Sequence, residues 1–527
     1  MNLESIKSLE IDQKILILGL GRENSQFLEW LVNVVKIPVD KVLIADKNTS
    51  LKNRFALPNN QFYLGEDYLD SLRLKEIEFV FKSPGIWSLL PELQEFRKIK
   101  GEHSITSSLV FFFQKFREQI IAVTGTKGKS TTCSLINHFL NNSSDGTTKS
   151  SYCGNTTNIS PYSFWKYQDQ KVDKNQYFVI ETSSFQLQDL GFANISPKYS
   201  LITNYYIDHL DQHDSVKEYW KAKDNIYKYQ YPTDLLICSD QVIEVRPDIL
   251  SANTINKFVV KWALADLAAK NLNSHLLGDH NSYNLALAII VYITITEDIH
   301  EVASESKITN WLKSNNTHLQ TTLSKFVSLK HRLELIRTHS FDFKFLESHE
   351  ITVNLNFYDD GYATEPDAVT AAVRALTKRP NEFLWLLVAG VDKGGNLSGL
   401  AKEILDIQLK NKLFRVDYAG QVGQNLLNQV YAIAGYNSDS DSLESLKEIA
   451  NNIFRDLSKL EKLIEEFLIE RWNNIQVIGD LDVLGSELGS GKQIFNIVLS
   501  PSGSSFDEFK NSEERANWWV DVVNKVV

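Results

Sequence analysis

"IIAVTGTKGKSTTCSLINHFL", residues 120–140, runs from an apolar strand through a turn with two glycines into an amphipathic helix. Glycines allow a sharp turn in which successive backbone N–H groups can point at a phosphate. The helix offers its N-terminal dipole to the same anion, Lys129 adds a full positive charge, and Ser130 or Thr131 can bind Mg²⁺. The stretch therefore predicts a phosphate-binding loop. Its residues are Gly125, Thr126, Lys127, Gly128, Lys129, Ser130 and Thr131.

The spacing of this loop is GxxGKS, because Val123 and Thr124 leave no earlier glycine. It is shorter than the GxxxxGK[ST] of the usual Walker loop. A lysine-rich turn without a ligand is the alternative, and the order of strand, turn and helix argues against it. The short spacing favours an ATP-using ligase over most P-loop switches and kinases.

The composition favours a globular protein of several domains. At roughly 150 residues per domain, 527 residues suggest about three or four domains. With 43% hydrophobic and 11% aromatic residues the chain can build real cores. A net charge of -11 argues against a nucleic-acid or anionic-membrane binder. An anionic ligand would therefore need local Lys, Arg or metal.

Three features predict a cytoplasmic chain without membrane insertion. Its three cysteines, Cys133, Cys153 and Cys238, are far apart and form no CxxC pair, as in reduced cytosolic proteins. The first 14 residues are too charged for a signal peptide. The longest apolar run, LALAIIVYITI, is about half of the ~20 residues that a membrane helix needs. We take the chain to be a monomer, although no feature of the sequence bears on its oligomeric state.

Strands and helices alternate along the chain, which predicts an α/β fold with parallel sheets. KILILGLG, KVLIAD and FVFKSPGI are strands of a first unit, and SQFLEWLVNVV is its helix. A second unit has the strands EQIIAVTG, YFVIETSS and YSLITN and the helix NSYNLALAIIVYI. A third has the helix EPDAVTAAVRALTK and the strands FLWLLVAGVD and FNIVLSPSGSS. The periodicity and mixed charge near 435–475 predict one or two surface helices.

Further motifs occur in a consistent order around the loop GTKGKST. They are GLGREN, KSPGI, VIETSSFQL, DHLDQH, EYWKAKDNIY, GDHNSYNLALA, KHRLEL and SPSGSSFDEFKN. Together they resemble the Mur ligase family, in particular the branch that adds D-glutamate to UDP-N-acetylmuramoyl-L-alanine. The resemblance extends from about residue 14 to about residue 525 but is patchy, and the helices near 435–475 look like an insertion.

The resemblance implies three domains. Residues 1–107 would form a Rossmann-like domain for the UDP-linked substrate, residues 108–329 a central P-loop ATPase domain, and residues 330–527 a Rossmann-like domain for the amino acid, including the insertion. It also implies ATP and two Mg²⁺ ions, an acyl-phosphate intermediate, and a role in making peptidoglycan precursors.

The resemblance also implies site residues beyond the loop. The UDP-linked substrate would contact Gly21, Arg22, Asp46, Lys47, Ser83 and Gly85 from the first unit and Asn155, Ser183 and Gln186 from the second. ATP would contact Asn281, Asn284, Arg332 and Asp360, and Arg332 would reach the γ-phosphate when the third domain closes. The acidic acceptor would contact Thr364, Lys393 and Ser505. The metal ligands would be Ser130, Glu181, His209 and Lys223.

Several of these residues also have a simpler interpretation. Glu181 ends a strand near the phosphate loop, a position that suits a Mg²⁺ ligand. The simpler interpretation is that Glu181 is an acid near the N-cap of a helix. His209 and His213 have a spacing that suits a metal on a helix, but a solvated loop fits His213 better. Lys223 would by default be a solvated helix lysine. The family match instead implies carbamylation by CO₂, which requires a neutral amine and therefore a lowered lysine pKa.

Other interpretations concern the adenine of ATP and the two Rossmann-like units. Asn281 and Asn284 could hydrogen-bond adenine, and helix capping is the alternative role for them. GLGREN is only a weak dinucleotide fingerprint, because Asn24 stands where a third glycine belongs, so a nucleotide-diphosphate site fits better than NAD. Asp360 resembles an acid that holds the ribose or orients the loop. Two residues depart from the family, Tyr362 in place of a lysine and Ser512 in place of an aromatic residue, and they put the identity of the acceptor in doubt.

Two other functions fit parts of the chain. A folylpolyglutamate synthetase shares the ATPase core and adds glutamate, but it lacks the UDP-binding first domain that the N-terminal motifs predict. A regulatory P-loop NTPase would not need the third domain or Lys223.

Overall fold

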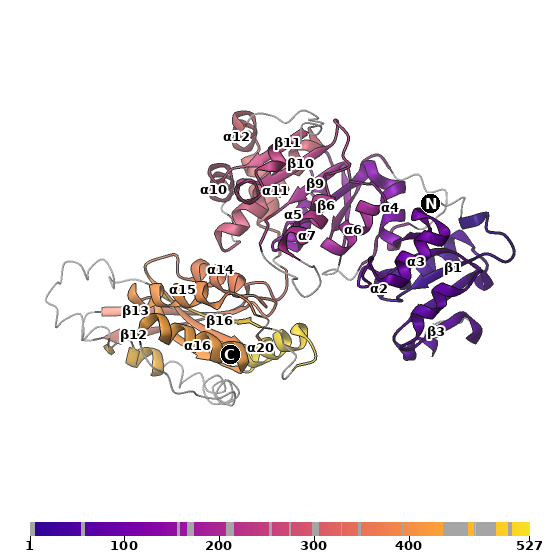
Figure 1. Cartoon of the computed structure of the whole chain (residues 1–527). Coiled ribbons are helices and arrows are strands. Elements are labelled where there is room, and N and C mark those ends of the chain that lie inside the picture. Colours follow the sequence, from indigo (N-terminus) through magenta and orange to yellow (C-terminus); the bar gives the residue numbers. More distant parts are fainter. Residues whose placement is uncertain are drawn as a thin grey trace. The chain divides into compact units, whose positions relative to one another are not determined.

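The computed structural model describes most of the chain. The described residues are 6–526 except 54–57, 155–158, 166–172, 207–214, 252–255, 273, 275, 298–304, 328, 346–348, 393, 436–461, 468, 471–491 and 504–508. They form three β-sheets flanked by helices, which confirms the predicted three-domain α/β class (Figure 1). Two compact units contain them. One comprises Met1–Ser274 and Asn281–Phe326, and the other comprises His275–His280 and Val327–Val527.

The N-terminal sheet is parallel, with the strand order β3-β2-β1-β4-β5. Its inner strands are nearly continuous apolar runs, as strands buried on both faces require. Leu93 and Phe96 of α3 cover one face, and Phe27 and Leu28 of α2 cover the other. The elements are β1 (Lys14–Leu18), α2 (Arg22–Trp30), η1 (Leu31–Val35), η2 (Val39–Lys41), β2 (Val42–Asp46), η3 (Thr49–Asn53), η4 (Asn59–Gln61), β3 (Phe62–Leu64), η5 (Tyr68–Arg73), β4 (Ile77–Lys82), α3 (Pro91–Lys100), η6 (Glu102–Ser104) and β5 (Ile105–Thr106).

The central sheet is also parallel, with the order β11-β10-β9-β6-β8-β7. Because β6 lies between β8 and β9, the segments that follow these three strands meet at one edge of the sheet. The elements are α4 (Ser108–Phe116), η7 (Arg117–Gln119), β6 (Ile120–Thr124), α5 (Lys129–Asn141), β7 (Lys149–Cys153), η8 (Pro161–Ser163), β8 (Gln176–Glu181), α6 (Ser184–Phe192), β9 (Tyr199–Ile202), α7 (Val216–Asp224), β10 (Leu235–Ser239), α8 (Asp240–Val245), α9 (Asp248–Ser251), β11 (Asn256–Val260), α10 (Trp262–Asn271), α11 (Asp279–Thr296), α12 (Glu305–Ser314) and α13 (Asn316–Leu323).

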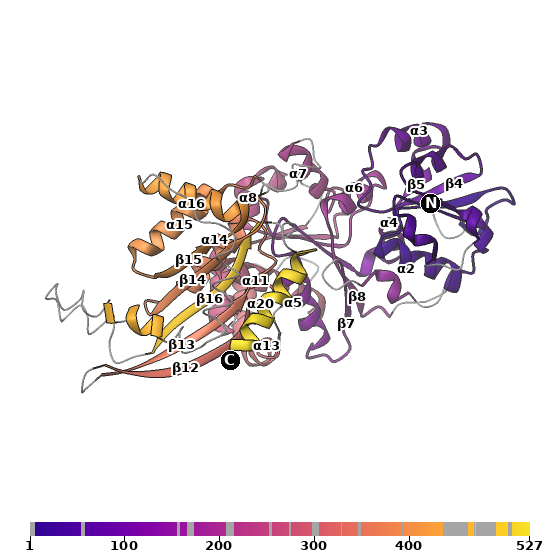
Figure 2. The same cartoon turned by 90° about the horizontal axis from the view of Figure 1, so that it is seen from below.

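The C-terminal sheet has the order β12-β13-β16-β14-β15, and its first two strands form an antiparallel hairpin beside parallel strands. Helices α14, α15 and α16 cover one face, and α20 packs on the other, against β12 and β13 (Figure 2). The elements are β12 (Glu334–Phe345), β13 (His349–Asp359), α14 (Pro366–Leu376), β14 (Glu382–Ala389), α15 (Leu397–Leu409), β15 (Leu413–Tyr418), α16 (Gly420–Ala434), β16 (Gln493–Ser502) and α20 (Ser512–Val526).

The predicted helical insertion near 435–475 lies largely outside the described residues. Residues 462–467 and 469–470 are described, and they are helical. Ile464 is buried in the same cluster as Trp519 and Val523 of α20. This short part of the insertion therefore contributes to the core of the C-terminal sheet.

Helix α4 joins the first two sheets into one core. Its sequence, SLVFFFQKF, is mostly apolar and mostly buried, and the Ser107 side chain caps it by accepting from Val110 N. Rings of α2, α4 and the central domain pack together here, among them Phe27, Trp30, Phe111, Phe112, Tyr162, Trp165 and Phe178. The boundary predicted at 107/108 thus falls at a helix N-cap inside a continuous core.

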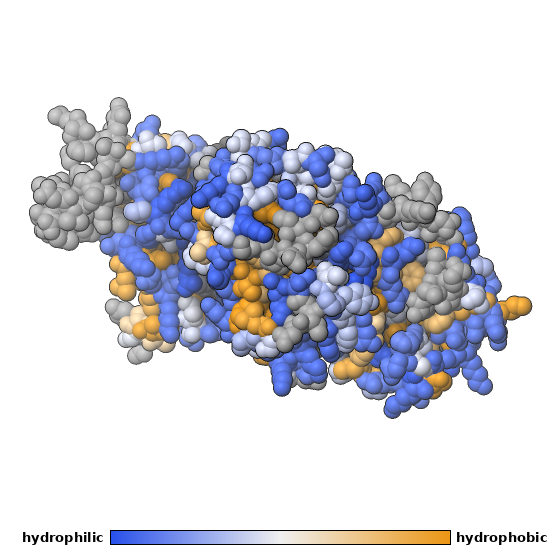
Figure 3. All heavy atoms as spheres, turned by 90° about the horizontal axis from the view of Figure 1, so that it is seen from above, coloured by the Kyte–Doolittle hydropathy of each residue, from blue (hydrophilic) through white to orange (hydrophobic). Residues whose placement is uncertain are grey.

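Figure 3 shows hydrophobic side chains in separate patches between hydrophilic ones on the face that it presents. None of the described helices combines the length and the hydrophobicity that a bilayer crossing requires.

Candidate functional site

The phosphate loop lies between β6 and α5, as the sequence predicts. Gly125 and Gly128 have positive φ angles, 144° and 83°. A Cβ at Gly125 would lie 1.9 Å from Thr203 Oγ1, and one at Gly128 would lie 2.5 Å from Asn284 Oδ1. Both glycines are therefore required by backbone conformation and by close packing.

Two lysine ammonium groups meet at the first carbonyl of this loop. Lys129 Nζ donates to Gly125 O and to Thr126 O, at 3.0 Å each. Lys223 Nζ, from α7, donates to the same Gly125 O at 3.0 Å. Lys223 is only 2% exposed, and its ammonium lies 4.6 Å from the centre of the Tyr219 ring. The structure therefore brings Lys223 to the phosphate loop, where a solvated lysine would not be.

Oxygen atoms gather beside the loop around Glu181, the last residue of β8. Its carboxylate accepts hydrogen bonds from Ser130 Oγ at 2.9 Å and from Tyr152 Oη at 3.0 Å. Gly154 keeps close to this acid, because a Cβ there would lie 2.8 Å from Glu181 Cβ. A carboxylate and a hydroxyl are ligands that Mg²⁺ prefers. The predicted pair Ser130 and Glu181 therefore fits Mg²⁺.

Two side chains that follow β9 hold the first half of the loop, a role that sequence reasoning missed. Asn204 Oδ1 accepts hydrogen bonds from Thr126 N at 3.1 Å and Lys127 N at 2.9 Å, and Asn204 Nδ2 donates to Lys127 O at 3.0 Å. Thr203 Oγ1 also donates to Lys127 O. The available signal is the position of Asn204 directly after a strand that neighbours β6.

The two asparagines of α11 lie under the loop. Asn284 is buried and accepts from Thr132 Oγ1 at 3.1 Å, while its Nδ2 donates to Asn281 at 2.9 Å. Asn284 also faces Gly128 across the gap that the missing Cβ leaves. The structure therefore places Asn284 as a support of the phosphate loop. Thr131 follows on α5 and is half-buried.

Ser183 and Gln186 form a capping box at the start of α6. Ser183 Oγ accepts from Gln186 N, and Ser183 N donates to Gln186 Oε1 at 2.9 Å. Gln186 Nε2 donates to Glu23 of the N-terminal domain at 3.0 Å, and Ser108 Oγ donates to the same carboxylate at 2.6 Å. Burial raises the pKa of Glu23. These contacts tie α6 to the first domain, where the resemblance implies contact with the UDP-linked substrate.

The predicted UDP-site residues of the first domain share one edge of its sheet. Gly19 follows β1 with φ 77°, and a Cβ there would lie 2.8 Å from Ser83 Cβ, just after β4. Leu20 N donates to the Asp46 carboxylate at the end of β2, at 2.6 Å. Because β2, β1 and β4 are neighbours, their carboxyl ends form one crevice edge, the usual ligand position in such sheets. Gly21 and Gly85 lie on the same turns, Arg22 begins α2, and the exposed Lys47 pairs with Glu66 at 3.1 Å.

In the C-terminal unit, Arg332 lies on a turn held by Asp360. Leu333 N donates to Asp360 Oδ1 at 3.0 Å, and Ser500 Oγ donates to Asp360 Oδ2 at 2.7 Å. Burial raises the pKa of Asp360 to about 7. The contact with Leu333 fits the loop-orienting role of the two that the resemblance allows for this acid. Thr364 lies on the same segment, where its N–H donates to Tyr362 O at 3.0 Å.

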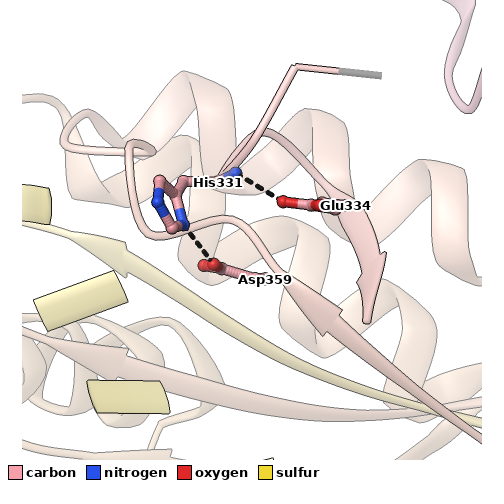
Figure 4. Close-up of side chains that lie close together, drawn as sticks. All are labelled: His331, Glu334 and Asp359. Atoms are coloured by element: carbon pink, nitrogen blue, oxygen red, sulfur yellow. Dashed lines mark hydrogen bonds and ion pairs between the residues drawn. The ribbon is translucent and has the colours of Figure 1, made fainter. Parts of the chain in front are cut away.

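His331, Glu334 and Asp359 form a cluster beside this turn (Figure 4). Their potential ligand atoms lie within 4.8 Å of one another. His331 Nδ1 and Asp359 Oδ2 are hydrogen-bonded at 2.6 Å, and His331 N donates to Glu334 Oε2 at 2.9 Å. Burial raises the pKa of Asp359. The three side chains are thus engaged in holding the turn.

Four predicted site residues lie outside the described residues. They are Asn155, His209, Lys393 and Ser505. Their roles remain predictions from sequence.

Comparison with known proteins gives the same family as the motifs. Residues 123–259 match the Mur ligase middle domain. The chain is 27% identical to the UDP-N-acetylmuramoylalanine–D-glutamate ligase of Clostridium tetani, over 99% of this chain and 98% of that protein. The enzyme of the same name from Fervidobacterium nodosum is 26% identical, over 97% and 99%. The resemblance to the Mur ligase family is thus confirmed.

Solved structures were matched as well. One is the MurF ligase of Thermotoga maritima in complex with ADP, at 11% identity and a TM-score of 0.45, over 99% of this chain and 96% of that one. Another is a murein peptide ligase of Psychrobacter arcticus, at 16% identity and a TM-score of 0.40, over 96% and 98%.

Proposed function

We propose that this chain, which carries a Mur ligase middle domain, is an ATP-dependent ligase that joins D-glutamate to UDP-N-acetylmuramoyl-L-alanine in peptidoglycan precursor synthesis. The observation that carries the proposal is the phosphate loop with Lys129, Lys223, Ser130 and Glu181 around it. Similarity to D-glutamate ligases over nearly the whole chain supports the choice of substrates.

The proposed reaction has two steps. The carboxylate of the alanyl substrate attacks the γ-phosphorus of ATP, which gives an acyl-phosphate and ADP. The amine of the amino acid then attacks the acyl carbon, phosphate leaves from the tetrahedral intermediate, and the amine loses a proton. Negative charge develops on oxygen atoms in both steps, so fixed positive charge accelerates both.

Lys129 would supply the nearest fixed charge to the transferred phosphate. Ser130 and Glu181, with His209 and a carbamylated Lys223, would hold two Mg²⁺ ions. Bound Mg²⁺ polarises phosphoryl oxygens and neutralises developing charge. Carbamylation requires the neutral amine of Lys223, whose side chain is buried beside the loop. Arg332 would add charge at the γ-phosphate when the C-terminal domain closes and excludes water.

The first domain would bind the UDP-linked substrate at the crevice edge formed by β2, β1 and β4. Gln186, held by Glu23, would extend this site into the central domain. The proposed substrates, ATP and a nucleotide-linked sugar, place the reaction in the cytoplasm. We take the enzyme to act as a monomer.

The acceptor amino acid would bind in the C-terminal domain through Lys393, Ser505 and Thr364. A charge-assisted bond from Lys393 to a side-chain carboxylate contributes about 1.5–3 kcal/mol, so glutamate should be preferred over a neutral residue by roughly ten- to a hundredfold. Lys393→Ala should therefore raise the KM for the acceptor far more than that for ATP. An equal rise in both constants would contradict this placement of the acceptor.

One assay tests the proposal as a whole. ADP release is measured with UDP-N-acetylmuramoyl-L-alanine or with a folate, each across a panel of D- and L-amino acids. We expect release only with the UDP-linked substrate, with D-glutamate as the best acceptor. Release with the folate would favour a folylpolyglutamate synthetase. Release in the absence of both the UDP-linked substrate and the folate would favour a regulatory NTPase. A neutral or basic acceptor that works as well as D-glutamate would overturn the acceptor but not the ligase.

A further inference from the structure

Two segments from distant parts of the central domain hold the phosphate loop. Asn204 binds the amides of Thr126 and Lys127 across 78 and 77 positions of sequence. Lys223 donates to Gly125 O across 98 positions, at 3.0 Å. Side chains that reach the loop from so far along the chain stay in place only when other contacts fix their segments. A further contact is therefore needed to hold Asn204 and Lys223 relative to each other.

One hydrogen bond joins the two segments directly beside these contacts. Tyr205 follows Asn204 in the chain, and Asp224 follows Lys223 at the end of α7. Tyr205 Oη donates to Asp224 Oδ1 at 2.8 Å, and the tyrosine is only 2% exposed. The bond therefore links the chain neighbours of the two side chains that touch the loop, at a place that water hardly reaches.

Arg246, directly after α8, fixes the carboxylate of Asp224. Its Nη1 donates to Asp224 Oδ1 at 3.0 Å, and its Nη2 lies 2.8 Å from Oδ2. Bidentate charge-assisted bonds of this kind are strong and set the direction of both groups. The guanidinium carbon also lies 5.7 Å from the centre of the Tyr205 ring, within the range of a cation–π contact. Tyr205, Asp224 and Arg246 thus form one connected set, the Arg246 cluster.

Arg246 has a second acidic partner, Asp248, which differs from Asp224 in position and exposure. Arg246 Nε and Nη2 donate to the Asp248 carboxylate at 2.9 and 2.6 Å. The Asp248 side chain is 62% exposed, whereas those of Asp224 and Arg246 are each 15% exposed. An exposed ion pair contributes little to stability, and Asp248 is not a chain neighbour of either residue that touches the loop. Asp248 therefore offers a control for Asp224.

The two segments meet a second time at Thr126 of the loop. Tyr206 N donates to Thr126 Oγ1 at 3.0 Å, and the Tyr219 hydroxyl lies 3.3 Å from the same oxygen. The Lys223 ammonium group lies 4.6 Å from the centre of the Tyr219 ring. The loop, residues 204–206 and α7 thus form a closed ring of contacts, and the Arg246 cluster completes this ring.

We propose that the three residues of the Arg246 cluster are positioning residues, which keep Asn204 and Lys223 in the places from which they shape the phosphate loop for a nucleotide. The proposal rests on the proposed use of ATP and goes beyond it, because none of the three belongs to the predicted site and none touches the loop in the described contacts. A loop whose amides are already aimed loses little conformational entropy when the phosphates arrive. Without the cluster, the nucleotide itself would have to order the two segments, and its affinity would fall.

The test compares two ligands of the same chain. Dissociation constants for ADP with Mg²⁺ and for UDP-N-acetylmuramoyl-L-alanine are measured by calorimetry on the full chain, together with the melting temperature. A residue that acts through the phosphate loop should weaken ADP binding and spare the UDP-linked ligand. A residue with only a structural role should weaken both ligands alike, or lower the melting temperature and leave both affinities unchanged.

The expected results follow from the strength of each contact. Asp224→Asn keeps the shape of the side chain but loses the charge-assisted bonds, so it should weaken ADP about tenfold and the UDP-linked ligand by less than about twofold. Tyr205→Phe loses only the hydroxyl and should weaken ADP about threefold. Arg246→Lys keeps the charge without the bidentate geometry, so its ADP affinity should fall between those of wild type and Arg246→Ala. Asp248→Asn, the matched control, should leave both dissociation constants within about twofold of wild type.

A double variant tests whether the cluster acts through Asn204. Tyr205→Phe added to Asn204→Ala should cause little further loss of ADP binding, because the contact that the tyrosine positions is already gone. Full additivity would overturn the proposal, and so would equal losses for ADP and the UDP-linked ligand. A loss for Asp248→Asn as large as that for Asp224→Asn would overturn it as well.

Two further outcomes separate this inference from the proposed function. Wild-type chain that binds no ADP would overturn the proposed function and the inference together. Wild type and Asp224→Asn that bind ADP with equal affinity would overturn the inference alone. Should Asp224→Asn fail to fold, Tyr205→Phe, which removes a single oxygen atom, and its double variant decide the question.

Discussion

The turn after β1 and the loop after β6 are built alike and differ in the charge around their amides. Each follows an inner strand of a parallel sheet and begins with a glycine at positive φ, 77° for Gly19 and 144° for Gly125. In the first, the Leu20 amide is bound by the carboxylate of Asp46. In the second, two consecutive amides are bound by the neutral side chain of Asn204, and two ammonium groups lie 3.0 Å from Gly125 O.

The difference would allow one backbone shape to serve two ligands. A carboxylate repels a nearby phosphate but accepts hydrogen bonds from hydroxyl groups, so the Asp46 side of the first turn suits a sugar or a base. A neutral acceptor with the Lys129 ammonium group beside it suits a triphosphate. In both cases the deciding side chains come from neighbouring strands and helices, and not from the glycine turn itself.

The largest expected effect comes from removing the charge within the second loop. Lys129→Ala should lower turnover by a hundredfold or more, because a preorganised charge beside developing phosphate charge stabilises the transition state by several kcal/mol. ADP release is the measurement, with circular dichroism to verify the fold. Lys115→Ala, an exposed lysine of α4, is the control. If folded Lys129→Ala released ADP at a near-normal rate, the positive charge would not be what distinguishes the loop after β6 from the turn after β1.

The second ammonium group belongs to Lys223. Its removal tests whether carbamylation turns this positive charge into a negative one. Lys223→Ala should be inactive or nearly so, and short carboxylic acids should restore part of its activity by replacing the carbamate. The matched control is Lys221→Ala, since Lys221 is exposed on the same helix and pairs with Glu218 at 3.6 Å. A crystal structure with Mg²⁺ and nucleotide that shows an unmodified Lys223 would refute carbamylation.

A third test makes the second loop resemble the first. Asn204→Asp keeps the acceptor for the Thr126 and Lys127 amides, loses the donor to Lys127 O, and adds a negative charge. We expect the KM for ATP to rise about tenfold or more, because a carboxylate close to the phosphates costs several kcal/mol even at an effective dielectric constant of about 20.

The reverse exchange completes this test. Asp46→Asn should raise the KM for the UDP-linked substrate and leave that for ATP within about twofold, since Asp46 binds only amides of the first domain in the described contacts. If Asn204→Asp changed both constants alike, the charge around the loop would not be what selects the ligand.

The sequence predicted those elements whose signal is local. The strands β1, β2, β6, β8 and β9 are mostly apolar, and the glycines, Lys129 and Ser130 of the loop follow from its own spacing. The antiparallel partner strands β12 and β13 escaped prediction. Their alternation of polar and apolar residues, as in FDFKF, gives a weaker signal than a continuous run.

Contacts between distant segments could not be predicted in the same way. Asn204 reaches the phosphate loop only because β9 neighbours β6. The local sequence of neither segment predicts this strand order. The bond from Gln186 to Glu23 joins residues 163 positions apart and depends on how two domains pack. Lys223 looks like a solvated lysine until α7 is placed beside Gly125. The family resemblance implied a role for Lys223 that stays a prediction, and the structure supplied the contact with Gly125.

The smallest expected effect concerns another acid, Asp360 directly after β13, and is seen in stability. Like Asp46, Asp360 accepts an amide of a neighbouring turn, but it is only 9% exposed, and burial raises its pKa to about 7. A carboxyl whose pKa is higher in the folded state than its unfolded value of about 3.9 binds its proton more tightly when folded. Its contribution to the free energy of unfolding is therefore full below about pH 4 and is lost as the pH rises toward 7. Asp360→Asn lacks this titration, so the stability of wild type minus that of the variant should fall by about 2–3 kcal/mol at most between pH 5 and pH 8. Urea unfolding of both proteins, followed by tryptophan fluorescence at several pH values, measures the difference. A difference that stays constant across this range would show that Asp360 is ionised throughout and that burial does not raise its pKa.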